Sequence, residues 1–383
     1  DAAGQALTGQ PCETSLVAEG GTVYRLADPQ ATVEIEEAGP ERAVIRTVGH
    51  LVDADGKPCF EIEQRIEAYR GQAYVRIHHT FLNDCPEQWT NLERMTWHVP
   101  LPGDWQATLA EGDPVRLTAE PITQRFDTAI VQGGAQRDAR LVGTVLGGPN
   151  GAAAALKDGW QNYPIGLSAD SQGLNIDLCA EFEPGVYDQF PIEKEGHHLY
   201  FYLLNGHYRF KQGMAKTHDL FLTFTPAAQS AVDTALFQQP PLLVAPPTWY
   251  CDSLAFYNVA PRDPVRFKAY EEAMDANLAA YVKGREKQHD YGLMNYGDWY
   301  GERGSNWGNI EYDTQNAFLL EFIRSGNPEA FYLADSTELH NREIDTVQWA
   351  PNPHNLGGVY IHQMGHVGGY YTESVPGTLG FPQ

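Results

Sequence analysis

The feature that most constrains the fold is a change of hydrophobic period close to Thr225. Before it, apolar and polar residues alternate, as in the runs FEIEQRIEA at 60–68 and AYVRIHHTF at 73–81. After it, apolar side chains recur at spacings of three and four, as in Phe267, Tyr270, Met274, Leu278 and Tyr281. A period of two is typical of half-buried strands, and a period of 3.6 is typical of amphipathic helices. The chain therefore predicts a β domain followed by an α domain.

Turn signals in the first part favour antiparallel pairing of its strands. The two alternating runs at 60–68 and 73–81 are separated by only a short turn, which predicts a β-hairpin. Asn205-Gly206 is a dipeptide preferred where both turn residues need positive φ. Because many such short strands follow one another, we expect a large antiparallel β-sandwich over residues 1–228.

Prolines mark the boundary between the two parts. Four of them lie within residues 229–250, which we interpret as an extended linker because proline disfavours both helix interiors and central strands. In the following residues, 251–383, Asp263 and Pro264 predict a helix start, and a Gly-Asn-Pro break at 326–328 predicts two helices joined as an αα-hairpin. Stacked αα-hairpins build an (α/α) toroid, and the few helices visible here lead us to expect only its N-terminal part.

The charge balance excludes several classes of protein. With 26 basic and 50 acidic residues the formal charge is -24, which repels nucleic acid and acidic membrane surfaces. No run approaches the ~20 apolar residues of a membrane helix. The five cysteines contain no C-x-x-C pair, so neither a zinc ribbon nor a dense disulfide framework is encoded, although one bridge remains open. Acidic residues abound, but no calcium-binding loop motif is present, so we predict neither calcium nor any other metal or cofactor.

Several separate segments resemble one known family. They are residues 37–49, 74–81, 159–164, 215–224, 295–313 and 340–346. In this order they resemble the rhamnogalacturonan exolyase-like proteins, polysaccharide lyase family 26 and its relatives. The resemblance implies a β-sandwich followed by an (α/α) toroid, and cleavage of a uronic-acid-containing polysaccharide by β-elimination. We therefore expect a secreted or periplasmic polysaccharide lyase whose partner is an acidic polysaccharide, with self-association or a further chain to complete the toroid left open.

The elimination sets the chemistry that a site must supply. Removing the C5 proton of a uronate builds negative charge on its carboxylate, which a cation or amide must stabilise, while a base takes the proton and an acid protonates the leaving oxygen. We assign Arg303 and Asn309 to the carboxylate, although Asn309 fits equally well as a helix cap. Tyr312, at the start of a helix, is our candidate acid, with core packing as the alternative.

Three histidines are candidates for the base. His362 and His366 stand four residues apart, which on a helix would suggest a metal pair, but the glycines around them favour a loop that carries the base instead. His340 lies at a helix end, where a structural role beside the helix dipole suits it as well as catalysis. By contrast, His79 is in phase with the apolar face of its strand, which predicts a hydrogen-bonded core histidine.

Aromatic and basic residues suggest how the sugar chain is bound. Sugar rings stack on flat aromatic faces, which makes Trp299, Tyr300 and Trp307 candidate platforms, with plugging of the toroid mouth as the alternative. A locally basic segment contributes Arg209, Lys216 and His218, which we expect to orient a polyuronide unless they form an ordinary solvated charge run.

Two other functions fit the same residues. A glycoside hydrolase would use paired carboxylates drawn from Asp298, Glu302, Glu311 and Asp313. A non-catalytic carbohydrate-binding or structural protein would retain acidic polysaccharide without cleaving it. A lyase is distinguished from both because its product carries a conjugated double bond that absorbs ultraviolet light.

Overall fold

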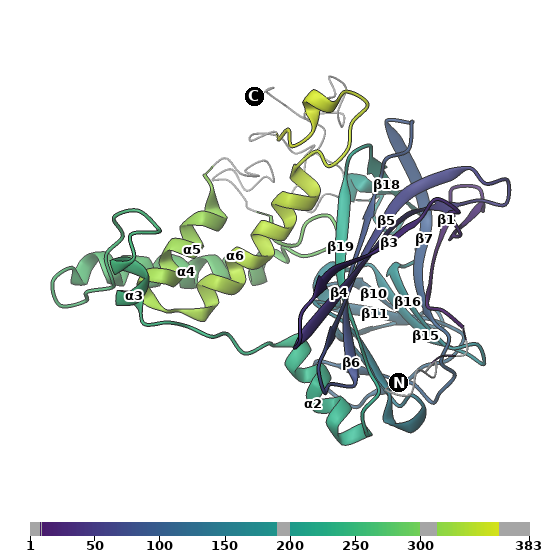
Figure 1. The fold of residues 1–383 in the computed structure, drawn as a ribbon, viewed down its shortest axis with the longest axis horizontal. Coiled ribbons are helices and arrows are strands. Elements are labelled where there is room, and N and C mark those ends of the chain that lie inside the picture. The colour runs from purple at the N-terminus through teal and green to yellow at the C-terminus, as the bar shows by residue number, and fades with distance from the viewer. Residues whose placement is uncertain (1–7, 9, 190–199, 299–311, 360–383) are drawn as a thin grey trace.

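The structure is a computed structural model that describes residues 8, 10–189, 200–298 and 312–359. It consists of an antiparallel β-sandwich followed by a helical, toroid-like domain, which lies beside the sandwich and is joined to it by a long connection (Figure 1). This confirms the predicted fold class. Within the described ranges, no helix combines the length and apolar character needed to cross a bilayer.

One layer of the sandwich carries the strands that face the helices. Its order is β3–β4–β5–β6–β19–β14–β13–β8–β9, and every neighbouring pair is antiparallel. The bounds are β3 Thr32–Ala38, β4 Arg42–Val52, β5 Pro58–Tyr69, β6 Tyr74–Leu82, β8 Gln106–Leu109, β9 Val115–Arg116, β13 Leu141–Leu146, β14 Ala153–Leu156 and β19 Ala215–Thr223. β19 therefore lies at the centre of this layer, between β6 and β14.

The other layer has the order β2–β1–β7–β16–β15–β10–β11–β12, also antiparallel. β2 also pairs with β4, which joins the two layers at one edge, and the β17–β18 hairpin pairs with β7. The bounds are β1 Glu13–Ala18, β2 Val23–Leu26, β7 Trp89–Val99, β10 Ile122–Phe126, β11 Ala129–Gln132, β12 Ala135–Asp138, β15 Ile165–Ala169, β16 Leu174–Cys179, β17 Leu203–Leu204 and β18 His207–Lys211.

The structure confirms the hairpin, turn and core-histidine predictions made for the sandwich part of the sequence. β5 and β6 form the predicted hairpin, with Ile62 opposite Phe81. Asn205 and Gly206 have φ angles of 54° and 77° in the turn between β17 and β18. His79 is fully buried, and its Nε2 lies 2.8 Å from the hydroxyl of Thr14, as expected of a hydrogen-bonded core histidine. The space between the layers is filled by large side chains that include Trp97, Trp105, Tyr163, Tyr187, Tyr202, Tyr208, Phe60, Phe81 and Phe210.

The helices begin earlier than the sequence predicted. The linker assignment for 229–250 is wrong over most of its length, because α2 spans Ala227–Gln238 and α3 spans Pro247–Asp252. The proline-free run before Pro240 is compatible with a helix, and α2 packs against β13, β14 and β19. Only residues 239–246 form the extended connection.

The later helices follow their capping signals. α4 spans Lys268–Gln288 and starts after the predicted point, because the Asp263 carboxylate caps only a short turn through the N–H groups of Val265 and Arg266. α5 spans Thr314–Ser325 and α6 spans Pro328–His340, with Gly326 at φ 74° and Asn327 capping α6 as predicted. α6 continues into a π-helical turn, Asn341–Asp345; the short 3-10 turns are Pro149–Gly151, Trp160–Asn162, Tyr200–Tyr202 and Pro353–Asn355.

Two backbone seams fix the helical domain to the sandwich. At the first, the N–H groups of Gly292 and Leu293 donate to the carbonyl oxygens of Gln161 and Tyr163, each at 2.7 Å. At the second, the N–H of Gln348 donates to the carbonyl oxygen of Gly213 at 2.9 Å. Apolar side chains from both segments, Tyr291, Leu293, Met294, Ile344, Val347 and Ala350, join the sandwich core. The surface between the two seams is where a groove forms.

Candidate functional site in the groove between the two domains

Three adjoining cavities make up one groove between the sandwich and the helices. A cavity of about 670 Å³ shares Lys157, Asp158, Tyr296 and Asp335 with a second of about 210 Å³. The second cavity in turn shares His78, Thr217, Arg342 and Glu343 with a third of about 420 Å³. The groove therefore runs along β6 and β19 on one side and along α6 and its π-helical turn on the other.

The sandwich wall carries a histidine that is oriented by a carboxylate. The register of β6 and β19 places His78 opposite Asp219, and the His78 Nδ1 lies 2.6 Å from an Asp219 oxygen. Arg76 also donates to Asp219. Although burial opposes it, hydrogen bonding from His78 and the charge of Arg76 hold the pKa of Asp219 well below its usual range. The imidazole of His78 is 28% exposed, so a ligand in the groove can reach it.

Two further residues of β19 line the central cavity. The Lys216 ammonium lies 3.4 Å from a Glu343 oxygen, and both side chains are almost fully buried. Burial lowers the pKa of His218 well below its usual range, and the nearby charge of Lys216 lowers it further, so this imidazole is neutral. Arg342 pairs with the same Glu343 at 3.3 Å. Two cations thus share one carboxylate within this cluster, whereas across the whole lining of the central cavity the cations Arg76, Lys157, Lys216 and Arg342 match the carboxylates Asp158, Asp219, Asp335 and Glu343 in number.

The helical wall presents a phenol. Tyr296 lies in the turns that follow α4, where the Arg285 guanidinium sits 4.7 Å from its ring centroid and Tyr291 stacks on it at 6.0 Å. Burial raises the pKa of Tyr296, and the neighbouring Asp158 raises it further. The phenol therefore keeps its proton at neutral pH and can act as a hydrogen-bond donor or as an acid.

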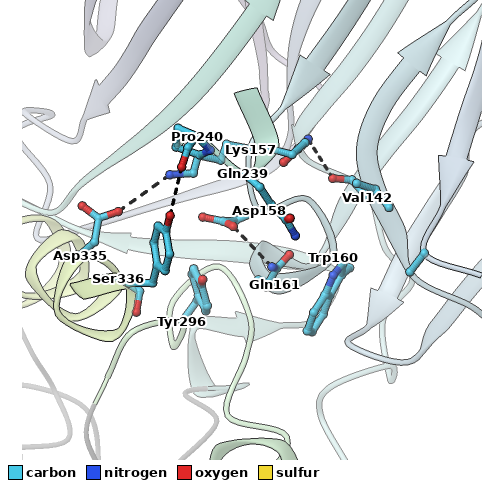
Figure 2. A pocket seen from close by; sticks show the side chains of 13 residues that line it. Val142, Lys157, Asp158, Trp160, Gln161, Gln239, Pro240, Tyr296, Asp335 and Ser336 are labelled. Carbon is cyan, nitrogen blue, oxygen red and sulfur yellow. Dashed lines mark hydrogen bonds and ion pairs between the residues drawn. The ribbon is translucent and has the colours of Figure 1, made fainter. Parts of the chain in front are cut away.

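The turn after β14 contributes the base of the 670 Å³ cavity. Asp158 adopts a left-handed backbone conformation, φ 53°, which is uncommon outside glycine and asparagine and is often found at functional sites. Figure 2 shows its carboxylate facing the hollow between Tyr296 and Lys157, with Asp335 on the far side bonded to Lys157. Burial raises the pKa of Asp158; the charge of Lys157 opposes this rise, whereas Asp335 adds to it.

Polar atoms without partners cluster in this groove. Among the described residues, four buried atoms of its lining make no hydrogen bond: Arg76 Nε, Gln161 Oε1, Asn162 Oδ1 and His218 Nε2. Buried polar groups are nearly always hydrogen-bonded, because leaving one unsatisfied costs about 1–3 kcal/mol. Their concentration around one hollow indicates a surface organised to bind a polar ligand.

The sequence-predicted residues fall in several places. Lys216 and His218 line the groove, whereas Arg209 lies elsewhere on the sandwich with its guanidinium 4.7 Å from the Trp89 ring centroid. Tyr312 is 64% exposed and is not among the residues that line the three cavities. The other candidates Trp299, Tyr300, Arg303, Trp307, Asn309, His362 and His366 lie outside the described residues.

His340 is buried in a charged cluster away from the lining of the groove. Its Nε2 lies 3.3 Å from Asp298 and 3.6 Å from Asp345. Burial alone would lower the pKa of His340, but the two carboxylates raise it to about 10. The cluster ties the end of α6 to the segment that follows Tyr296. Of the described carboxylates proposed for hydrolysis, Asp298 is held in this cluster and Asp313 precedes α5, so neither lines the groove.

Sequence reasoning did not assign the groove residues Arg76, His78, Asn162 and Tyr296 to the site. All four lie inside segments that carry the family resemblance: Arg76 and His78 in 74–81, Asn162 in 159–164 and Tyr296 in 295–313. The polar alternation of β6 did not single out Arg76 and His78, because both look like ordinary outward-facing strand residues. In the part of the chain that the structure describes, no cluster of three or more His, Cys, Asp or Glu side chains is placed to hold a metal ion.

The architecture is that of a two-domain protein, a β-sandwich followed by a helical toroid-like domain. Residues 22–104 match the model of the PcRGLX-like protein central beta sandwich domain, and residues 240–357 match that of the PcRGLX-like protein C-terminal alpha/alpha toroid domain. The chain belongs to this rhamnogalacturonan lyase-like family, which confirms the resemblance seen in its sequence. These are domains of carbohydrate-active proteins.

Individual relatives are more distant. The chain is 30% identical to the uncharacterized protein YetA of Bacillus subtilis (strain 168) over 152 residues, which span 35% of this chain and 18% of YetA. The GH36 alpha-galactosidase AgaA of Geobacillus stearothermophilus matches 55% of this chain and 29% of its own, with 13% identity and a TM-score of 0.30. A putative aldose 1-epimerase of Klebsiella pneumoniae matches 60% of this chain and 65% of its own, also at 13% identity and a TM-score of 0.30. Scores this low support no functional comparison.

Proposed function

We propose that the protein is a polysaccharide lyase that cleaves a uronic-acid-containing chain by β-elimination in the groove between its two domains. The observation that carries the proposal is the chemistry of the central cavity. Its lining combines two cations that share one carboxylate, a carboxylate-oriented imidazole and a protonated phenol. Family membership supports the same class of reaction.

Neutralisation of the uronate carboxylate is assigned to Lys216 and Arg342. Because these two cations share the single carboxylate of Glu343, their charge is only partly compensated within this cluster and can act on a substrate carboxylate. A cation placed where charge develops stabilises the transition state more strongly than the ground state, and it does so most effectively in a site shielded from water. The Asn162 side chain donates through Nδ2 to the Asp158 carbonyl oxygen at 2.9 Å, and its Oδ1, which has no partner, is available to accept a hydrogen bond from a sugar hydroxyl in the same cavity.

The proton transfers are assigned to His78 and Tyr296. His78, oriented by Asp219, takes the proton from C5; the C5–H electron pair forms the C4–C5 double bond while the C4–O bond breaks. Tyr296 gives its proton to the departing oxygen, so one product carries the unsaturated uronate and the other a new hydroxyl group. Proton exchange with water then restores His78 and Tyr296. His218, neutral and nearly buried, positions the substrate by a hydrogen bond from the floor of the cavity.

Paired carboxylates favour hydrolysis as a second candidate function. Asp158 and Asp335 line both the cavity of about 670 Å³ and the central cavity of about 210 Å³, and the raised pKa of Asp158 is what a general acid requires. In that reaction Asp158 would protonate the glycosidic oxygen and Asp335 would activate water. The sugar would then be cleaved without forming a double bond.

One assay separates the candidates. The purified chain is incubated with a panel of acidic polysaccharides that includes rhamnogalacturonan, and both ultraviolet absorbance and new reducing ends are followed. We expect both to rise together on a uronate polymer. New reducing ends without a rise in ultraviolet absorbance would indicate that the groove catalyses hydrolysis. Retention of the polymer without either signal would indicate a protein that binds carbohydrate without cleaving it.

Two histidine variants test the assigned roles. His78→Gln is expected to lower kcat about 10²- to 10⁴-fold, as loss of a general base does. His218→Gln is expected to act mainly on KM, because its role is positioning. The assignment fails if His218→Gln abolishes turnover while His78→Gln leaves kcat unchanged, with circular dichroism showing both variants folded.

A further inference from the structure

Two of the five cysteines meet at the end of the β5–β6 hairpin. Cys59 belongs to β5 and Cys85 follows β6, and their Sγ atoms lie 2.8 Å apart. Both side chains are buried, with 7% and 4% exposed. Carbon-sized non-bonded contacts lie at about 3.5–4.0 Å, so two sulfur atoms at this separation are already close to bonding.

An irregularity in β5 turns Cys59 toward its partner. The register of β4 against β5 shifts between His50 and Leu51, and Phe60 adopts φ 59°. A bulky aromatic residue in the left-handed region is strained, and such strain persists only where the surrounding structure imposes it. The bulge breaks the strand alternation, so that Cys59 and the adjacent Phe60 are both buried.

The backbone around Cys85 is fixed just as firmly. The Asn83 side chain accepts the Cys85 N–H at 3.2 Å and donates to the carbonyl oxygen of Phe210 at 3.0 Å. The Gln212 side chain donates to the Cys85 carbonyl oxygen at 2.6 Å. Residues from β18 and the turn after it thus hold Cys85 against Cys59, and the contact does not depend on a mobile loop.

The two thiols have different chemical roles. A hydrogen bond from Cys59 lowers the pKa of Cys85; burial opposes this shift, and the N–H of Phe60 and the hydroxyl of Thr90 reinforce it. The same contact with Cys85, together with burial, raises the pKa of Cys59. Cys85 is therefore the thiol that more readily becomes the attacking thiolate.

We propose that Cys59 and Cys85 form a disulfide when the protein meets a small-molecule disulfide such as oxidised glutathione. The Cys85 thiolate attacks one sulfur of the oxidant, forming a mixed disulfide and releasing one glutathione thiol. Cys59 then loses its proton and attacks the Cys85 sulfur, which releases the second glutathione thiol. Two protein thiols are oxidised and one small disulfide is reduced to two thiols. The bond closes the chain across 26 positions and fits the oxidising compartment expected for a secreted or periplasmic protein.

The test counts thiols in the full chain. The protein is refolded in a glutathione buffer, either reducing or oxidising, alkylated under denaturing conditions, and examined by mass spectrometry and peptide mapping. We expect five alkylated cysteines after reducing treatment and, since two are consumed, three after oxidising treatment, with the peptides of Cys59 and Cys85 linked. The oxidised form should also melt on the order of 5 °C higher.

Matched variants keep the test decisive. Cys251→Ser removes a cysteine outside the pair, so this control should still lose two thiols on oxidation. Cys85→Ser should lose none, and the double variant Cys59→Ala/Cys85→Ala serves if that single change prevents folding. Five alkylated cysteines in the oxidised wild-type protein, or a link between any other two cysteines, would overturn the proposal.

Discussion

The two domains are held together by different forces. The sandwich surrounds a large core whose widest side chains are almost completely buried, whereas the helical core is smaller in the part of the chain that the structure describes, where its cluster of buried side chains consists of Leu278, Phe322, Ile323, Ala330 and Leu333. Ion pairs add to the stability of the helical domain: the partly buried Arg324 pairs with the buried carboxylates of Glu271 and Glu321. Large apolar side chains such as Leu243 and Val265 remain 93% exposed there. The difference indicates that the sandwich is stabilised by the packing of its own core. The helical domain depends instead on ion pairs and on its contacts with the sandwich.

The largest loss of stability is expected from a Leu→Ala substitution, which we compare between the cores of the two domains. Leu92→Ala removes a fully buried side chain from the sandwich and should lower the free energy of unfolding by about 4 kcal/mol. Leu333→Ala, at 6% exposure in the smaller core, should cost about 2 kcal/mol because its surroundings can relax into the space. Urea unfolding followed by fluorescence measures both. Equal costs would contradict the contrast between the two cores.

A second comparison concerns the buried charges. Arg324→Leu leaves two buried carboxylates without their cation and should destabilise the helical domain by about 3 kcal/mol at neutral pH. Arg262→Leu is the control, because its pair with Asp275 is solvent-exposed and should be worth less than about 1 kcal/mol.

The loss at Arg324 should depend on pH. Arg324 lowers the folded-state pKa of Glu271, so its contribution is complete above the usual glutamate pKa of 4.5 and disappears as the pH falls below it. Arg324→Leu and wild type should therefore converge in acid. A difference between them that stays constant from neutral to acidic pH would be inconsistent with charge pairing as the cause.

How far the sequence alone predicted these features depends on how local each signal is. The β5–β6 hairpin, the Asn205-Gly206 turn and the Asn327 cap are each encoded within a few residues, and all were predicted. α2 was missed because Pro240 and Pro241 dominated the interpretation of the segment that precedes them. The groove brings together β6, the turn after β14, β19 and the π-helical turn, and no spacing rule links positions so far apart in sequence.

The attachment of the helical domain to the sandwich is tested at Gly213, in the second backbone seam. Gly213 has φ 87°, and an added Cβ would clash with the carbonyl oxygen of Trp349. Gly112, at φ 94°, has open space around it and serves as the matched control for backbone strain. We expect Gly213→Ala to cost about 2 kcal/mol more than Gly112→Ala, and to increase hydrogen exchange in residues 346–349. If both variants behaved alike, this seam would not hold the domains together.

The His340 cluster provides a test of buried charge that depends on pH. Its pKa in the folded protein is raised from 6.5 to about 10, so the stabilisation is complete below pH 6.5 and is lost as the pH rises through 10. The free energy of unfolding should fall over that window in the wild type. His340→Gln should show a flatter profile, measured by urea unfolding at several pH values. A wild-type stability that rises with pH across this range would disprove the charged triad.

The central claim is that Lys216 and Arg342, two cations in the groove between the domains, stabilise the uronate carboxylate during elimination. The most direct measurement compares kcat/KM for unsaturated product in Lys216→Met and Lys211→Met. Both remove a buried lysine of the sandwich, but only Lys216 lines the groove, and Arg342 still pairs with Glu343 when it is replaced. We predict a fall of about 10²- to 10³-fold for Lys216→Met and a near wild-type rate for a folded Lys211→Met. An unchanged rate in Lys216→Met, on the same substrate, would contradict the account.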